Sequence, residues 1–177
     1  MVNPENGGLA PGLYLVATPI GNARDITLRT LDILRSADVL AAEDRPILAY
    51  HDHNGERVRP RILGWLEQGR SVAYASEAGT PMISDPGFDL ARAVREAGFD
   101  VTTAPGASAV IAALTLAGLP TDRFFFAGFL PNAAAARRTA LSEVADVRAT
   151  LVFYESPRRL GAMLADAATS LGADRSA

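Results

Sequence analysis

Short apolar runs alternate with helical patterns along most of this 177-residue chain, and this alternation limits the possible folds more than any other feature. The run LYLVATPI (13–20) lacks the polar alternation of a half-exposed strand, which indicates a strand buried on both faces. The other predicted strands are DVLAAED (38–44), SVAYAS (71–76), FDVTTAP (99–105), RFFFAGFL (123–130) and ATLVFY (149–154). Because helical patterns separate these runs, we predict βαβ units and an α/β fold with a parallel sheet.

Cap and turn residues set the expected limits of the helices. Asp25 is the predicted N-cap of a helix over residues 26–36, and Gly69 ends a short helix over residues 60–68. Ser156, followed by Pro157, is the predicted N-cap of the last helix. The remaining helical patterns cover residues 88–97, 107–118 and 134–144.

The order of these elements predicts two domains. Residues 13–120 form an N-terminal α/β domain, and residues 121–177 begin a second one. A weak boundary lies at GLPTDR (118–123), where a helix of small residues gives way to an aromatic strand.

Composition restricts the classes of function. The chain has no cysteine and only two histidines, so no disulfide framework and no Cys/His metal centre are expected. Its net charge of −3 means that contact with nucleic acid needs a local basic patch. No segment has the roughly 18 apolar residues of a membrane span, and the N-terminus lacks a leader pattern. We therefore expect a cytoplasmic protein without metal or membrane contact, with residues 1–12 as a disordered lead.

The segments that follow the predicted strands are rich in glycine and proline. They are TPIGN (18–22), AED (42–44), SEAGTP (76–81), PGAS (105–108) and GFLP (128–131). In an open parallel sheet, ligands bind outside the carboxyl ends of the strands, and glycine lets the backbone approach a ligand closely. Neither GxxxxGK[ST] nor GxGxxG is present, so a phosphate-binding loop or dinucleotide fingerprint is not expected. These loops predict a pocket for a nucleoside-like ligand, held largely by backbone groups.

Several of these segments carry a specific resemblance. The combination VATPIGN, AAED, AGTPMISDPG and FYESP resembles the bacterial 2′-O-ribose methyltransferases that modify a cytidine of 16S ribosomal RNA. These enzymes belong to the tetrapyrrole methylase superfamily, and the similarity runs over nearly the whole chain from Leu13. It implies a tetrapyrrole-methylase-like α/β fold of two domains, usually in a homodimer, and S-adenosylmethionine as the methyl donor.

The resemblance also implies which residues contact the methyl donor. They come from four of the loops: Pro19, Ile20, Gly21 and Asn22; Ala78, Gly79, Thr80 and Pro81; Pro105, Gly106, Ala107 and Ser108; and Gly128, Phe129 and Leu130.

Transfer to a ribose hydroxyl needs alignment and a base, because the hydroxyl is a very weak acid. The candidate bases are the carboxylates Glu43, Asp44, Asp85 and Glu155. Each has a structural alternative. Glu43 and Asp44 end a strand and are suited to capping the next helix, Asp85 precedes a proline in a possible Asx turn, and Glu155 is placed to hold Arg158 or Arg159.

Candidate RNA contacts are few. His51 and His53 share one face if they lie on a strand, and two arginine pairs, Arg137–Arg138 and Arg158–Arg159, stand near the starts of helices. The alternative for each is a solvent-exposed edge or helix end. Phosphate contacts of this kind would give affinity without sequence information.

The chain departs from the family pattern in two places. Only PIL stands between AAEDR and AYHDHN, where the family has a longer segment, and the second domain is expected to be incomplete at SLGADRSA. Both departures suit a portion of a longer protein; an intact mass near 18.6 kDa would contradict this hypothesis. In addition, alanines in NAAAARR replace most of the family's basic stretch after FLP.

Three alternatives to ribosomal RNA methylation remain open from the sequence. A methylase of the same fold could act on a tetrapyrrole or on a protein side chain. The chain could also bind S-adenosylmethionine without transferring a methyl group. A nicotinamide-dependent oxidoreductase is disfavoured because the dinucleotide fingerprint is missing.

Overall fold

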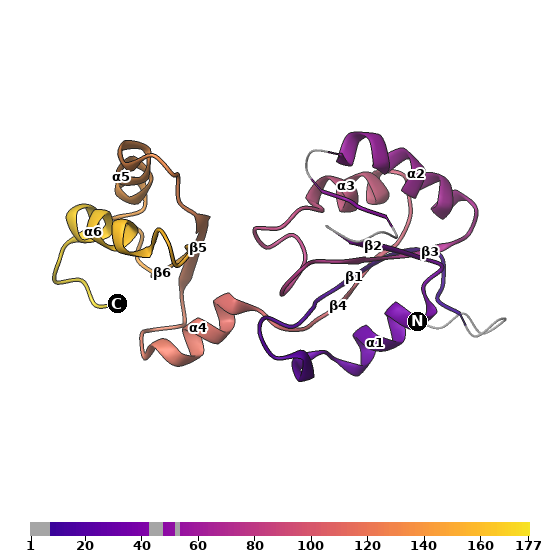
Figure 1. Ribbon diagram of the computed structural model, residues 1–177, viewed down its shortest axis with the longest axis horizontal. Coiled ribbons are helices and arrows are strands. Elements are labelled where there is room, and N and C mark those ends of the chain that lie inside the picture. Colours follow the sequence, from indigo (N-terminus) through magenta and orange to yellow (C-terminus); the bar gives the residue numbers. More distant parts are fainter. Residues whose placement is uncertain (1–7, 43–47, 52–53) are drawn as a thin grey trace. The chain divides into compact units, whose positions relative to one another are not determined.

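The computed structural model describes residues 8–42, 48–51 and 54–177, and Figure 1 traces their path. The chain divides into two compact units, Met1–Ala109 and Val110–Ala177. The predicted boundary at residues 118–123 lies nine or more residues later, so most of the helix before it groups with the second unit.

The first unit is built on a four-stranded parallel sheet. Its strands are β1 (Gly12–Val16), β2 (Val39–Ala42), β3 (Ser71–Ala75) and β4 (Val101–Ala104), in the spatial order β2-β3-β1-β4. Leu13 of β1 pairs with Val72 on one side and Val101 on the other. The predicted α/β class with a parallel sheet is therefore confirmed.

Helices cover both faces of this sheet, which explains why its strands are continuously apolar. Figure 1 shows α2 (Gly55–Glu67) and α3 (Phe88–Glu96) on one face and α1 (Leu28–Ser36) on the other. Leu13 and Leu15 of β1 pack in the cluster under α2 and α3, whereas Tyr14 and Val16 pack with Ile33 of α1. Alternate side chains of one strand thus enter two separate cores, and neither face can be polar.

Three helix starts differ from the sequence predictions. Asp25 lies inside a 3₁₀ helix (Ala23–Asp25), and the N-cap of α1 is Thr27, whose hydroxyl accepts from the Thr30 N–H at 3.1 Å. The second helix, α2, begins at Gly55 rather than residue 60, with Pro60 inside its first two turns.

The last helix, α6 (Leu160–Leu171), starts four residues after Ser156, which was the predicted N-cap. The Arg159 N–H bonds to the Ser156 carbonyl at 3.0 Å and closes a turn ahead of the helix.

Residues 8–12, expected to belong to a disordered lead, take part in the fold. Leu9 packs against the core under α1, the Ala10 carbonyl accepts from the Tyr14 hydroxyl at 2.9 Å, and Gly12 pairs with Ser71. Residues 1–7 of that lead lie outside the described residues.

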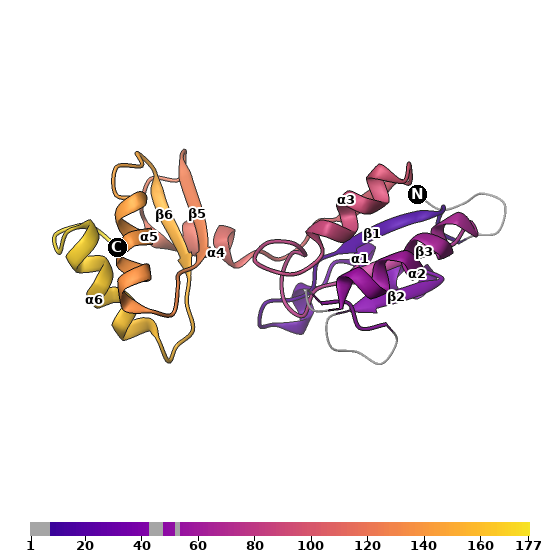
Figure 2. The same cartoon turned by 90° about the horizontal axis from the view of Figure 1, so that it is seen from above.

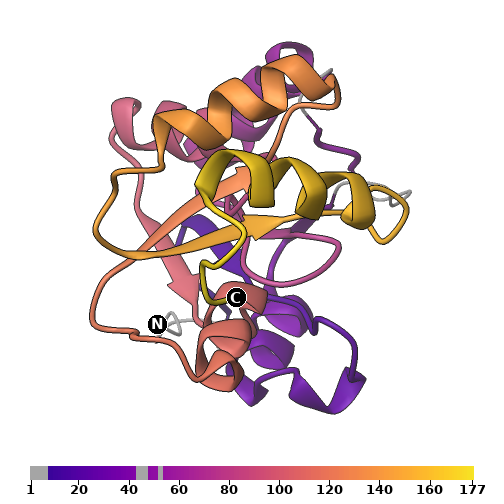
Figure 3. The same cartoon turned by 90° about the vertical axis from the view of Figure 1, so that its left-hand side faces the viewer.

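The second unit contains α4 (Ala109–Ala117) and a parallel pair of strands, β5 (Phe124–Phe129) and β6 (Thr150–Tyr154). Figures 2 and 3 show α5 (Ala134–Glu143) and α6 on one face of these two strands (Figure 2, Figure 3). Leu130, Leu141 and Met163 form the core between them. The pairing shifts between Phe126 and Phe129, around Gly128, whose φ is 67°.

A contact between Asp38, just before β2, and Ser71, the first residue of β3, predicts an effect of pH on the stability of the first unit. Asp38 accepts from the Ser71 N–H and hydroxyl, each at 2.7 Å. These bonds, the main-chain one first, hold the pKa of the Asp38 carboxyl below its ordinary value of 3.8. A carboxyl whose pKa is lower in the folded state stabilises the fold above the unfolded value and loses this contribution as pH falls through the folded value.

We therefore expect the free energy of unfolding to fall more steeply below pH 3.8 in the wild type than in Asp38→Asn. Urea titrations from pH 6 downward through pH 3.8 measure the difference. Parallel pH profiles of the two proteins would contradict this prediction.

Candidate functional site

Three loops at the carboxyl edge of the first sheet are joined to one another by main-chain and hydroxyl contacts. Thr18, after β1, and Gly79, after β3, exchange two backbone hydrogen bonds of 2.9 and 3.0 Å. The Thr18 hydroxyl donates to the Ser76 carbonyl at 3.1 Å, and the Ser76 hydroxyl donates to the Gly79 carbonyl at 2.8 Å. The loop after β4 joins them, because the Thr80 hydroxyl donates to the Ala107 carbonyl at 3.0 Å.

Two glycines allow the loops to come this close. Gly79 has φ of 82°, and a Cβ there would lie 3.3 Å from the Ile20 side chain. At Gly106 an added Cβ would stand 2.7 Å from the Ala17 Cβ, a distance that real Cβ atoms do not adopt. The glycines of AGTP and PGAS are thus required for loop packing as well as for access to the backbone.

The structure therefore brings together residues 19–22, 78–81 and 105–108, which were predicted to bind the methyl donor and which we call the three-loop cluster. Its outer surface is built from exposed small and apolar residues, including Gly21, Ala78 and Gly106, and from Ile20, which is 38% exposed. Such a surface offers backbone N–H and C=O groups to a ligand with few side chains in the way.

The fourth segment predicted to bind the methyl donor, residues 128–130, belongs to the second unit. Phe129 is 57% exposed at the end of β5, whereas Leu130 is buried in the core of that unit. A contact of Leu130 with a ligand would therefore be made through its backbone.

The loop that follows the cluster in sequence, residues 82–87, has an unusual backbone. Met82 and Ser84 adopt left-handed φ angles of 68° and 60°. The Tyr74 hydroxyl donates to the Pro86 carbonyl at 2.9 Å, and Gly87 lies so close to the Tyr74 ring that a Cβ would be 2.9 Å from it. Contacts to a core tyrosine therefore hold this loop in a conformation that non-glycine residues rarely adopt.

Asp85 stands in this loop and lines a cavity of about 180 Å³. Burial, and secondly the charge of Glu77, raise the pKa of the Asp85 carboxyl above its ordinary value. A half-buried carboxylate with a raised pKa, in a held loop that follows residues 78–81 in sequence, has the properties of a general base.

Glu155, the second described candidate base, is engaged in a different way. Its carboxylate receives the Arg159 guanidinium at 2.6 Å and the Ser156 N–H at 2.7 Å. The hydrogen bond from Arg159, followed by that from Ser156, lowers the pKa of the Glu155 carboxyl. This is the alternative interpretation of FYESPRRL, in which Glu155 holds an arginine, and it leaves Asp85 as the better base.

Three of the predicted site residues, Glu43, Asp44 and His53, lie outside the described residues. His51 is described, and it does not lie on a strand, the condition under which it would share one face with His53. Its carbonyl accepts from the Asn54 and Gly55 N–H groups, both at 3.0 Å, in the turn that leads into α2.

The four predicted RNA-binding arginines are all in the second unit and differ in exposure. Arg137 is buried: its guanidinium pairs with Asp166 at 2.6 Å and donates to the Asn132 carbonyl at 3.0 Å, which does not fit a role in RNA contact. Arg159 is also engaged, with Glu155 and with the Leu130 carbonyl. Arg138 and Arg158 are exposed and remain candidates.

Sequence reasoning missed Thr18, Ser76 and Arg59. The first two are the hydroxyl residues that link the loops. Each is the first residue of a loop segment, TPIGN or SEAGTP, and a hydroxyl residue at this position is a signal that could have identified them. Arg59 lines the same cavity as Asp85, and no sequence pattern connects it with the loop of residues 82–87.

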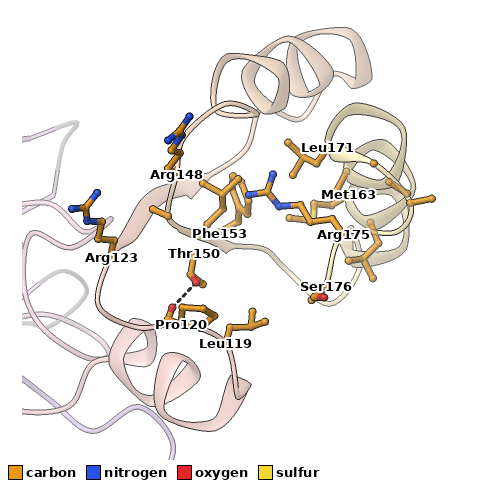
Figure 4. Close-up of a pocket in the computed structure, with 18 of the residues that line it drawn as sticks. Leu119, Pro120, Arg123, Arg148, Thr150, Phe153, Met163, Leu171, Arg175 and Ser176 are labelled. Atoms are coloured by element: carbon orange, nitrogen blue, oxygen red, sulfur yellow. Dashed lines mark hydrogen bonds between the residues drawn. The ribbon is translucent and has the colours of Figure 1, made fainter.

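A cavity of about 620 Å³ lies in the second unit, and none of the predicted site residues lines it (Figure 4). Phe153 of β6, Met163 and Leu171 of α6 and the Arg175 side chain project into it, whereas Arg123 and Arg148 stand at one side. Because Met163 also belongs to the unit's core, this cavity is an open side of that core.

Two negative findings apply to the described residues, 8–42, 48–51 and 54–177. They contain no cluster of histidine and carboxylate side chains that could hold a metal ion. In that same part of the chain, every helix is too short or too polar to cross a membrane.

Comparison with known sequences gives a consistent match. Residues 12–177 match the family model described as tetrapyrrole (corrin/porphyrin) methylases. The "Ribosomal RNA small subunit methyltransferase I" of Mesorhizobium japonicum is 47% identical over 96% of this chain and 62% of that protein. The protein of the same name from Pseudomonas aeruginosa is 46% identical over 93% of this chain and 64% of that protein. The chain thus spans less than two thirds of the length of these relatives.

Solved structures agree with the fold. Diphthine synthase gives a TM-score of 0.65 at 16% identity, covering 89% of this chain and 72% of the other. A cobalt precorrin-4 methyltransferase gives 0.61 at 17%, covering 89% and 74%. Uroporphyrin-III C-methyltransferase from Thermus thermophilus gives 0.52 at 26%, covering 70% and 64%.

Proposed function

This chain belongs to the tetrapyrrole methylase family, and from that membership we propose that it carries out S-adenosylmethionine-dependent 2′-O-methylation of a cytidine ribose in 16S ribosomal RNA. The observation that carries the proposal is the 47% identity, over almost the whole chain, to a protein named as a small-subunit ribosomal RNA methyltransferase. Proteins of the same fold that act on tetrapyrroles are less similar, at 26% identity for the uroporphyrin-III enzyme.

The three-loop cluster fits S-adenosylmethionine as methyl donor. The exposed backbone at Gly21, Ala78 and Gly106 can hydrogen-bond the adenine, ribose and amino-acid groups, and Gly106 lets the loop after β4 lie against Ala17. When bound, the sulfonium supplies an activated methyl group that needs no metal or covalent intermediate.

The protein supplies alignment and removal of a proton. In the in-line displacement, the bond from carbon to sulfur breaks as the bond from carbon to the ribose oxygen forms, and the hydroxyl proton is transferred to a base. We assign this base to Asp85, because it lines a cavity in the loop that follows residues 78–81 in sequence and no arginine pairs with its carboxyl among the described residues.

A glycine substitution tests the donor site. Gly106→Ala should weaken S-adenosylmethionine binding about tenfold or more, because the new methyl group stands 2.7 Å from the Ala17 Cβ and forces the loop outward. Gly64→Ala is the matched control: nothing lies within 4 Å of a Cβ there, and the helix should be slightly stabilised. Isothermal titration with S-adenosylmethionine measures both, and wild-type affinity in Gly106→Ala would refute the assignment.

The function itself is tested by methyl transfer from labelled S-adenosylmethionine to small ribosomal subunits from a strain that lacks the protein. Nuclease mapping should place the label in a 2′-O-methylcytidine of 16S ribosomal RNA. Binding of the methyl donor without transfer to subunits would instead support a different acceptor or a binding-only role.

We further propose a homodimer that works in the cytoplasm, where ribosomal subunits are. Exposed apolar side chains support self-association: Leu116 of α4 is 85% exposed, and Phe124 and Phe125 of β5 are 44% and 40% exposed. Light scattering after size exclusion should give twice the monomer mass.

A further inference from the structure

The cavity beside Asp85 is about half polar and is formed by three segments of the first unit. Tyr50 comes from the chain before α2, Gly55 and Arg59 from the first turns of α2, and Asp85–Asp89 from the loop and first turn of α3. Its back wall is held in place, because the Tyr50 ring packs edge-on against Tyr74 at 5.7 Å. This wall is thus part of the core rather than a surface loop.

Arg59 brings an unused donor to this cavity. Its side chain is only 24% exposed and hydrogen-bonds the Tyr50 hydroxyl. Its Nε–H is buried and has no hydrogen-bond partner among the described residues. The Asp89 carboxylate lies 3.8 Å from a terminal nitrogen of the Arg59 guanidinium and is engaged more closely with Arg92, at 2.8 Å. A buried donor without a partner costs free energy, and a ligand oxygen would satisfy it.

The other charged groups of the cavity are acceptors, and the Tyr50 hydroxyl can both donate and accept. The carboxylates of Asp85 and Asp89 both line it, with Glu77 close enough to Asp85 to influence its charge. Two carboxylates oppose an anion such as phosphate but accept hydrogen bonds from hydroxyls. One arginine donor beside two carboxylate acceptors therefore matches a sugar, which both donates and accepts.

Size and the cavity rim favour one sugar of a larger ligand. At about 180 Å³ the cavity is below the roughly 300–1,000 Å³ typical of sites that enclose a whole small molecule. Phe88 also lines it and is 65% exposed, with the Arg92 guanidinium 5.5 Å from its ring. An exposed aromatic ring next to an arginine is a common platform on which a nucleic-acid base stacks.

We propose that the acceptor nucleotide binds here, with its ribose in the Tyr50–Arg59–Asp85 cavity, Arg59 Nε–H donating to a ribose oxygen and Phe88 stacking on the base. The assignment rests on the proposed function, and it places the ribose hydroxyl against Asp85. Arg59 and Phe88 are thereby substrate-binding residues, distinct from the three-loop cluster that holds the methyl donor.

The test compares Arg59→Met and Phe88→Ala with the wild type in methyl transfer to small subunits. Arg59→Met should raise KM for subunits roughly 10- to 100-fold, as expected for loss of a hydrogen bond from a charged group, with kcat changed less than about threefold. Phe88→Ala should raise KM about tenfold or more through lost stacking. Affinity for S-adenosylmethionine should be unchanged in both. Arg57→Gln, an exposed arginine on the same helix that does not line the cavity, is the matched control for charge.

The outcomes separate this assignment from the function on which it depends. Transfer by the wild type with an unchanged KM in Arg59→Met would overturn the assignment alone. If Arg59→Met fails to fold, Phe88→Ala decides, because an exposed side chain can be removed without loss of the core; an unchanged KM there would overturn the assignment. No transfer by the wild type would overturn the proposed function, and this assignment with it.

Discussion

Asp85→Asn lowers kcat for methyl transfer by roughly 10²- to 10⁴-fold, the contribution expected of a positioned general base. The amide keeps the shape and hydrogen-bonding reach of the side chain but cannot take up the ribose proton. Binding of S-adenosylmethionine should be unchanged, since Asp85 is outside the three-loop cluster. Single-turnover rates with small subunits measure the effect, and Asp32→Asn, an exposed carboxylate on α1, controls for the lost charge. A wild-type rate in Asp85→Asn would exclude this residue as the base.

The pH dependence of kcat gives a second measure of the same residue. Burial and the charge of Glu77 raise the pKa of Asp85, so the rate should rise with pH along a limb above 3.8. Arg59, Asp89 and Tyr50 line the same cavity as Asp85. The apparent pKa of this limb therefore belongs to the interacting groups together and not to Asp85 alone. Glu77→Gln removes a neighbouring negative charge, and it should move the limb to lower pH.

Arg137→Ala destabilises the second unit by about 3 kcal/mol, because it breaks a buried ion pair from one side. The Arg137 side chain is 7% exposed and Asp166 14% exposed, and the guanidinium also binds the Asn132 carbonyl. Its removal leaves a carboxylate and a carbonyl without their buried partner. Urea unfolding followed by circular dichroism measures the loss.

Arg138→Ala is the matched control, because Arg138 pairs with the same carboxylate at 3.1 Å but is 47% exposed. Exposed ion pairs contribute at most about 1 kcal/mol. Equal losses in the two variants would contradict the structural role given to Arg137. A weaker, more salt-sensitive binding of subunits by Arg138→Ala alone would assign RNA contact to the exposed member of the pair.

Much of the fold could be predicted because burial on two faces leaves a direct mark on sequence. SVAYA is apolar at every side chain that faces either core, and it forms β3 within one residue of the expected limits. Helix starts were less predictable. Thr27 and Asp25 are both good caps, and the choice between them depends on the 3₁₀ turn that Asn22 caps through the Arg24 N–H. The helix expected over residues 60–68 begins five residues earlier as α2, where Gly55 fits against Tyr50.

The candidate site could be predicted only in part, for a related reason. The glycines of AGTP and PGAS mark loops whose backbone approaches its neighbours closely, and the structure brings those loops together. The Thr18 hydroxyl contacts the carbonyl of Ser76, 58 positions away, and no local pattern encodes such a pair. Arg59 was invisible for the same reason, because its surroundings come from Tyr50 and from the loop of residues 82–87.

The left-handed angles at Met82 and Ser84 have a consequence for how this loop tolerates change. Each such angle costs a non-glycine residue about 1 kcal/mol, which glycine at the same position would avoid. A search for more stable variants would therefore favour glycine at positions 82 and 84. The same substitutions would widen the range of conformations open to Asp85, one position further on. Thermal robustness and accurate placement of the carboxylate are opposed within these few residues, so variants selected only for heat resistance should lose turnover here first.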